Sequence, residues 1–205
     1  MSNNIPAGAW LVGGGSKDEM VDAFREKGAI ALDWPDIGDL ALISSLDEFK
    51  MRLLQTFSGN APDHIREELK YLLWFMRLIA VDDYALIDKK QTDELIVGQV
   101  TSAVEYNPEL FGVRYPYIRR MKWLKHIPRD LFTLEAQQDL YSILPIEDIR
   151  SHRYEIHKHI TGKDYSEKFG PYQDIGVLKA FVRELAGETD DFLQSIWNIY
   201  SGGTR

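Results

Sequence analysis

The pattern of hydrophobic and polar positions changes period along the chain, and it predicts short strands and amphipathic helices in turn. Residues 8–12 (GAWLV) and 28–34 (GAIALDW) are short apolar runs, each typical of a buried strand. Between them, the apolar positions of residues 17–27 recur every three or four residues, which predicts a helix. The same patterns predict the elements that follow: a helix capped by Ser45, a helix at 65–79, and strands at 82–88, 94–106 and 112–124.

The order of these elements predicts an α+β fold. Short polar turns join the last three strands, so we expect them to pair antiparallel and to curve into a small, partly closed barrel. From Leu134 onward the pattern is helical. We therefore predict a mixed β-barrel with flanking helices in residues 1–132 and a helical C-terminal extension in residues 133–205. Its amphipathic segments 177–185 and 192–199 are compatible with packing on the barrel, with dimerisation, or with a connection to an effector domain.

Composition and charge narrow the class of protein. The 205 residues carry a net charge of -8, which argues against a protein that coats nucleic acid or membranes by charge alone. The absence of cysteine excludes disulfides and thiolate zinc sites, and it is typical of a reducing compartment. No apolar run approaches the roughly 20 residues that span a membrane, and the N-terminus does not resemble a signal peptide. We therefore expect a cytoplasmic protein with no membrane contact.

Three glycines at 13–15 lie between a predicted strand and a predicted helix, where phosphate-binding loops are found. Their spacing fits neither G-x-x-x-x-G-K-[ST] nor G-x-G-x-x-G. Asp18 and Glu19 would repel a phosphate, and they suit the N-terminus of a helix that Ser16 caps. We interpret the glycines as a turn.

Basic residues are concentrated in one predicted strand. Residues 113–129 (VRYPYIRRMKWLKHIPR) contain six lysines and arginines, three aromatic residues and no acidic residue. In an acidic chain this is typical of a phosphate track beside a surface on which bases stack, although a solvated edge strand is an alternative. Side chains alternate along a strand, so Arg119 and Arg120 should point to opposite faces. The candidate phosphate-binding residues are Arg114, Arg119, Arg120 and Lys122.

Several short motifs follow one another in a characteristic order. They are WLV at 10–12, GAIALDW at 28–34, GDL at 38–40, DDYALID at 82–88, IVGQVTSAVEYNP at 96–108, YPYIRRMKWL at 115–124 and IPRDLF at 127–132. Together they resemble a PUA-like module, related to EVE and YTH domains, that stands at the N-terminus of Mrr-type and McrB-type restriction proteins. The resemblance covers residues 8–132. It departs from the family pattern where Asp33 replaces a glycine, and where Asp82-Asp83 replaces a Gly-Asp pair.

This resemblance implies a PUA-like (EVE/YTH-related) fold and a recognition module in place of an enzyme. Members of the wider group take a modified base, flipped out of its strand, into an aromatic pocket whose flat rings replace the lost stacking. The resemblance implies that the partner is nucleic acid, with DNA as the expected kind. It also implies a role in restriction or antiviral defence, in which the domain acts with an effector nuclease or as a homodimer. The candidate residues of the base-binding pocket are Trp10, Asp33, Trp34, Tyr106 and Trp123.

Two other functions are compatible with the same residues. The pocket could take a small signalling nucleotide, which would not need the basic strand. The domain could also be a scaffold that docks a protein. In that case its binding activity would not depend on Trp10 and Trp34.

Enzyme signatures are weak in this chain. Residues 35–36 and 48–50 satisfy the PD…(D/E)-x-K pattern of metal-dependent nucleases, but the second half lies in a predicted helix, whereas the chemistry needs it on a strand. Three histidines lie in SHRYEIHKHI at 151–160, where an exposed helical face explains them more simply than a metal site. We therefore expect no catalytic residue, no metal and no cofactor.

Overall fold

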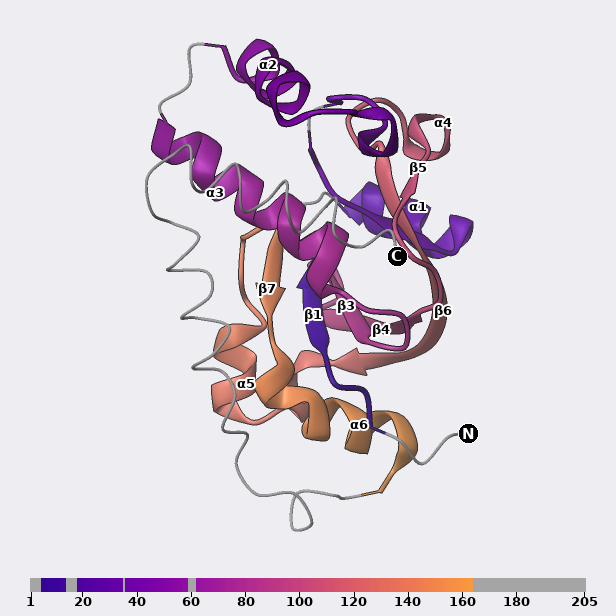
Figure 1. The fold of residues 1–205 in the computed structure, drawn as a ribbon. Coiled ribbons are helices and arrows are strands. Elements are labelled where there is room, and N and C mark those ends of the chain that lie inside the picture. The colour runs from indigo at the N-terminus through magenta and orange to yellow at the C-terminus, as the bar shows by residue number, and fades with distance from the viewer. Residues whose placement is uncertain (1–4, 14–17, 35, 59–61, 164–205) are drawn as a thin grey trace.

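One mixed β-sheet forms the centre of the molecule. The computed structural model describes residues 5–13, 18–34, 36–58 and 62–163. Within them the sheet has the order β2-β6-β4-β3-β1-β7, with β5 paired to β6, and it curls into a half-barrel (Figure 1). Neighbouring strands are antiparallel except β1 and β3, which are parallel.

The described elements have the following bounds. The strands are β1 (Ala9–Val12), β2 (Ala29–Ala31), β3 (Tyr84–Lys89), β4 (Glu94–Val100), β5 (Glu105–Tyr106), β6 (Tyr117–Pro128) and β7 (Ile146–Asp148). The α-helices are α1 (Asp18–Lys27), α2 (Leu46–Thr56), α3 (Pro62–Leu73), α4 (Pro108–Phe111), α5 (Leu134–Asp139) and α6 (Arg153–Thr161). Short 3-10 turns are η1 (Leu40–Leu42), η3 (Arg129–Leu131) and η4 (Arg150–His152), and a π-helical turn, η2 (Trp74–Leu78), continues α3.

Alternation along the strands creates two apolar faces. In β1, Trp10 and Val12 belong to one cluster, and Ala9 and Leu11 belong to the other. Side chains of α1 and α3 complete the first cluster, and side chains of α5 and α6 complete the second. Since both faces of the central strands are covered, β1 is apolar at every position, as its sequence pattern indicated, and β3 and β4 are apolar at most of theirs.

The predicted elements before residue 130 are confirmed, with shifted ends. The Ser45 hydroxyl accepts a hydrogen bond from the Glu48 amide at 3.2 Å and caps α2, as predicted. The strand expected at 94–106 is divided into β4 and β5, and the expected turn after it contains α4. The α+β class and the curved sheet are therefore confirmed. Among the described residues, no helix is both long enough and apolar enough to span a membrane.

Only the first glycine of the 13–15 run belongs to the described part of the chain. Gly13 has a φ of 74°, a left-handed conformation that favours glycine, and its amide donates to the Pro145 carbonyl at 2.8 Å. The remaining glycines and the predicted Ser16 cap lie outside the described residues.

The C-terminal part differs from its prediction at β7. A helical pattern was expected from Leu134 onward, but Ile146–Asp148 is a strand that pairs with β1, so the prediction is wrong there. Three residues carry too little periodicity to indicate a strand, and the pairing partner lies at the other end of the chain. The described residues of the predicted extension, with α5 and α6, pack on the second face. The segments 177–185 and 192–199 lie outside the described residues.

Two buried charged side chains connect distant segments. Asp83, which is 4% exposed, accepts hydrogen bonds from the amides of Gly8 and Ala80 and from Trp10 Nε1, at 2.8 to 2.9 Å. Arg129, which is 2% exposed, donates to Asp88 at 2.6 Å and to the Leu140 carbonyl at 2.6 Å. Each group has partners in place of water, as burial of a charge requires.

Candidate functional site

Predicted site residues from two distant segments meet beside the connection between β2 and α2. Arg114 donates to both carboxylate oxygens of Asp33, from Nε at 2.7 Å and from Nη2 at 2.6 Å. The Trp34 amide donates to the Arg114 carbonyl at 3.2 Å. Tyr106 Oη donates to the Asp36 carboxylate at 2.9 and 3.0 Å. We call Asp33, Asp36, Tyr106 and Arg114 the rim.

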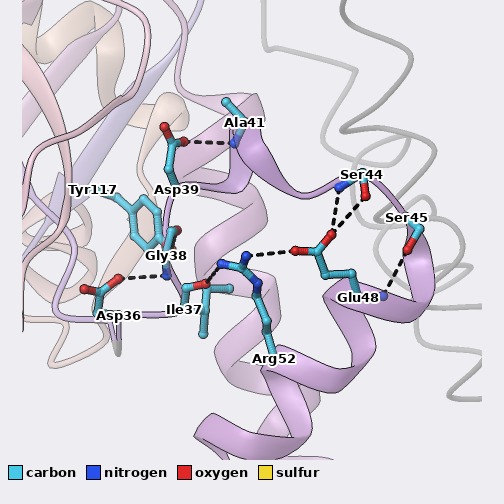
Figure 2. A network of polar contacts seen from close by, with 10 residues as sticks. All are labelled: Asp36, Ile37, Gly38, Asp39, Ala41, Ser44, Ser45, Glu48, Arg52 and Tyr117. Atoms are coloured by element: carbon cyan, nitrogen blue, oxygen red, sulfur yellow. Dashed lines mark hydrogen bonds and ion pairs between the residues drawn. The ribbon is translucent and has the colours of Figure 1, made fainter.

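A chain of hydrogen bonds fixes the backbone of the rim (Figure 2). The Gly38 amide donates to Asp36 at 2.8 Å, and the Gly38 carbonyl accepts from Tyr117 Oη at 2.8 Å. Gly38 has a φ of 86°, and a Cβ at this position would collide with the Arg52 guanidinium. Burial raises the pKa of Tyr117, and burial together with Asp36 raises the pKa of Tyr106. Both phenols are therefore neutral donors at physiological pH.

The far end of the connection is held by α2. Arg52 donates to the Ile37 carbonyl at 2.9 Å and to Glu48 at 2.8 Å, and Glu48 accepts from the Ser44 amide and hydroxyl at 3.1 and 3.0 Å (Figure 2). The Ser44 amide, followed by Arg52, lowers the pKa of Glu48. Glu48 and Lys50 thus lie on a helix, as expected, and Glu48 is engaged in a capping network. Pro35 of the nuclease pattern lies outside the described residues.

The Asp33–Arg114 pair is the most accessible ion pair of the rim. Arg114 exposes 74% of its side chain and Asp33 exposes 40%. The hydrogen bond to Asp33 raises the pKa of Arg114. The Arg114 guanidinium carbon lies 5.9 Å from the centroid of the Tyr115 ring. The rim therefore presents a paired cation and anion to solvent, and the cation lies near an aromatic ring.

The predicted pocket tryptophans lie in the apolar core. Trp10 is 1% exposed and donates from Nε1 to Asp83 at 2.9 Å. Trp34 is fully buried and packs edge-on against Phe57, with ring centroids 5.4 Å apart; its Nε1 has no acceptor among the described residues. Trp123 is half-buried against the first cluster. Neither Trp10 nor Trp34 presents its ring to solvent in this structure, so both act here as core residues.

The predicted phosphate-binding residues have different environments. Arg119 is 3% exposed and donates to the carbonyls of Phe75, Met76 and Ser102 at 2.8 to 3.1 Å; burial lowers its pKa to about 10. Arg120 is half-exposed and pairs with Glu105 at 2.9 Å. Lys122 is exposed and has no ion pair among the described residues. The expected alternation is confirmed, and it leaves Arg119 without access to a surface phosphate.

The histidines near the end of the described chain turn to different partners. His152 Nε2 lies 2.7 Å from Asp139, and His157 Nδ1 lies 2.7 Å from Tyr84 Oη. The His159 ring is tilted against the Phe132 ring, with centroids 4.7 Å apart. Among the described residues, no group of three or more histidine, aspartate or glutamate side chains could hold a metal ion.

Sequence reasoning missed two contributors to the rim. Asp36 was considered only as half of a nuclease pattern, and Tyr117 only as one aromatic residue of the basic strand. The signal for Asp36 was available in Asp36-Ile-Gly38, because an aspartate two residues before a glycine often accepts the glycine amide in a turn. No local signal connects Tyr106 to Asp36, which lies 70 positions earlier in the chain.

A family model described as Domain of unknown function (DUF8426) matches residues 10–143. The chain belongs to this family. The matched span begins at Trp10 in β1 and ends before β7, so it contains the whole rim and the whole of β6. The ion pair and the capping network described above therefore lie within the matched span. No curated protein matches the chain.

Proposed function

We propose that this domain binds nucleic acid and contacts one unstacked base, modified bases included, at the rim. The observation that carries the proposal is the placement of Arg114, Arg120 and Lys122. Their side chains reach the surface from one continuous stretch of an otherwise acidic chain, while Arg119 between them is buried. Surface cations in a row supply the phosphate contacts that dominate nucleic-acid affinity.

The spacing of these cations suits a strand that follows β6. Arg120 and Lys122 are two residues apart on one face, which separates their Cα atoms by roughly 7 Å. Arg114 lies before the start of the same strand and exposes 74% of its side chain, against 39% for Arg120. A nucleic acid on this line would pass from the half-barrel surface to the rim.

The rim offers the groups that an unstacked base needs. Tyr106 is half-buried and its hydroxyl donates to Asp36, so part of one aromatic ring borders a carboxylate of the rim, while the neighbouring Tyr117 ring is buried. Aromatic rings recover stacking, and carboxylates accept hydrogen bonds from base amino groups. The resemblance to modules of restriction proteins supports a role in restriction or antiviral defence, with any cleavage performed by another domain or chain.

The test is a binding titration with fluorescent single strands and duplexes, each unmodified or carrying one modified base, at two salt concentrations. Arg114→Gln, Arg120→Gln and Lys122→Gln should each weaken binding about three- to tenfold and lower the salt slope by roughly one contact. Lys158→Gln is the matched control, because α6 lies at the opposite end of the ribbon from α4 and β5 (Figure 1).

Three other outcomes of this titration would contradict the proposal or favour its alternative. Absence of salt-dependent binding of the wild type to every oligonucleotide would overturn the proposal. Losses in the three β6-side variants no larger than the loss in Lys158→Gln would overturn it as well. Binding of free nucleotides that survives Lys122→Gln would support the small-nucleotide alternative.

A further inference from the structure

The Asp33–Arg114 pair lies at the surface with both partners accessible to a ligand. In the free protein Asp33 occupies Nε and Nη2 of Arg114, at 2.7 and 2.6 Å. These two nitrogens form one of the two edges on which a guanidinium binds a phosphate in bidentate fashion. A phosphate that approaches Arg114 on this edge finds it already bound to a carboxylate.

A phosphate alone is a poor substitute for Asp33. The exchange would replace one anion by another on Arg114 and leave the Asp33 carboxylate without its arginine partner, close to a second negative charge. Exposed ion pairs exchange readily because water and ligand compete for both partners. A ligand gains from the exchange when it also supplies a hydrogen-bond donor to Asp33, since both halves of the opened pair are then satisfied.

The other carboxylate of the rim is less available. The two carboxylate oxygens of Asp36 already share the hydroxyl proton of Tyr106, and Oδ1 also accepts from the Gly38 amide. Asp33 has Arg114 as its principal partner, and 40% of its side chain is exposed. Asp33 is therefore the acceptor that a ligand can reach once Arg114 turns to a phosphate.

We propose, on the basis of nucleic-acid binding at the rim, that the pair opens onto one nucleotide: Arg114 binds a phosphate, and Asp33 accepts a hydrogen bond from the exocyclic amino group of the base. Asp33 is then the residue that determines specificity. The ligand class is a nucleotide whose base keeps at least one amino hydrogen, as in adenine, cytosine and their singly methylated derivatives. Thymine and uracil lack that donor.

The experiment compares single strands of about 12 thymidines whose central base is adenine, nebularine or thymine. Nebularine is the purine ring of adenine without the amino group, so it tests the donor alone. The wild type should bind the adenine strand about tenfold more tightly than the nebularine strand. Asp33→Ala should abolish this preference and bind the thymine strand about threefold more tightly, because Arg114 is released for phosphate. Arg114→Gln should weaken all three strands by a similar factor.

Asp22→Ala is the matched control, because Asp22 is also exposed and forms ion pairs with Lys89 and Arg25 instead of Arg114. It should behave as the wild type. An adenine preference that persists in Asp33→Ala would overturn the inference and leave the proposed function standing. A wild type that binds none of the three strands would overturn the proposed function itself.

Discussion

Two arginine–carboxylate pairs with the same closest distance lie in opposite environments in this fold. The closest contact is 2.6 Å in both Arg129–Asp88 and Arg114–Asp33. Both side chains of the first pair are 2% exposed, whereas those of the second are 74% and 40% exposed. A buried pair that loses one partner keeps an uncompensated charge, and an exposed pair returns its partner to water. An arginine–carboxylate pair therefore holds the fold together in one place and remains exchangeable in the other.

The largest effect should come from breaking the buried pair. Arg129→Met leaves Asp88 and the Leu140 carbonyl without their donor, and it should lower the free energy of unfolding by about 3–5 kcal/mol. Chemical denaturation measures this loss. Arg114→Met is the control and should change stability by no more than about 1 kcal/mol. Equal losses in the two variants would contradict the comparison.

The adjacent residues Arg119 and Arg120 of β6 show the same difference between a buried and an exposed arginine. Arg119→Met leaves three backbone carbonyls without a donor in the interior, and the expected loss is about 1–3 kcal/mol. Arg120→Met removes a half-exposed pair with Glu105, and the expected loss is below about 1 kcal/mol. Urea unfolding of both variants, compared at equal m-values, tests the ranking. A larger loss in Arg120→Met would reverse our interpretation of which face is buried.

The rim itself should contribute little to global stability. Tyr106→Phe removes the hydroxyl that donates to Asp36 and should cost about 0.5–1.5 kcal/mol. Faster hydrogen exchange should be confined to the residues around Gly38. Tyr141→Phe offers a control with a similar exposed hydroxyl–carboxylate contact, to Asp93 at 3.3 Å. Faster exchange throughout the sheet in Tyr106→Phe would show that the rim is structural.

The smallest effect concerns how the free energy of unfolding decreases at acid pH. The folded-state pKa of Glu48 is lowered from its ordinary value of 4.5, chiefly by the Ser44 amide. Ionised Glu48 therefore adds stability above the unfolded-state pKa, and this contribution is lost as pH falls through the lowered pKa. Wild type and Glu48→Gln should differ at neutral pH and converge in acid. Asp47→Asn, on the same turn of α2, is the control; a difference that grows in acid would contradict the prediction.

Local features of the fold were predictable from the sequence, because neighbouring residues determine them. The Ser45 cap and the helical setting of Glu48 follow from a few adjacent positions, and both are confirmed. The alternation that separates Arg119 from Arg120 requires only a strand. The short strand β7 was missed because its pairing with β1 depends on residues far away in the chain.

The candidate site was less predictable for the same reason. The run 113–129 contains no acidic residue, but the fold brings Asp33 to Arg114 and Glu105 to Arg120, so its charge is partly neutralised by other segments. Asp33 and Arg114 were assigned to a base and a phosphate separately, and they bind each other across 81 positions. The burial of Trp10 and Trp34 was also not predictable, since a tryptophan in a short strand of the sequence can line a pocket or lie inside a covered sheet.

The position of β1 between β3 and β7 has a consequence for the order of folding. Trp10 is in register with Ala85 on one side and with Asp148 on the other. The first strand of the chain therefore stays an open edge until one of the last described segments has been synthesised, and contacts of such long sequence separation form slowly. A chain interrupted after residue 132 would expose that edge together with the bare second face of the sheet. Such a fragment should associate with itself before it could be studied as an independent unit.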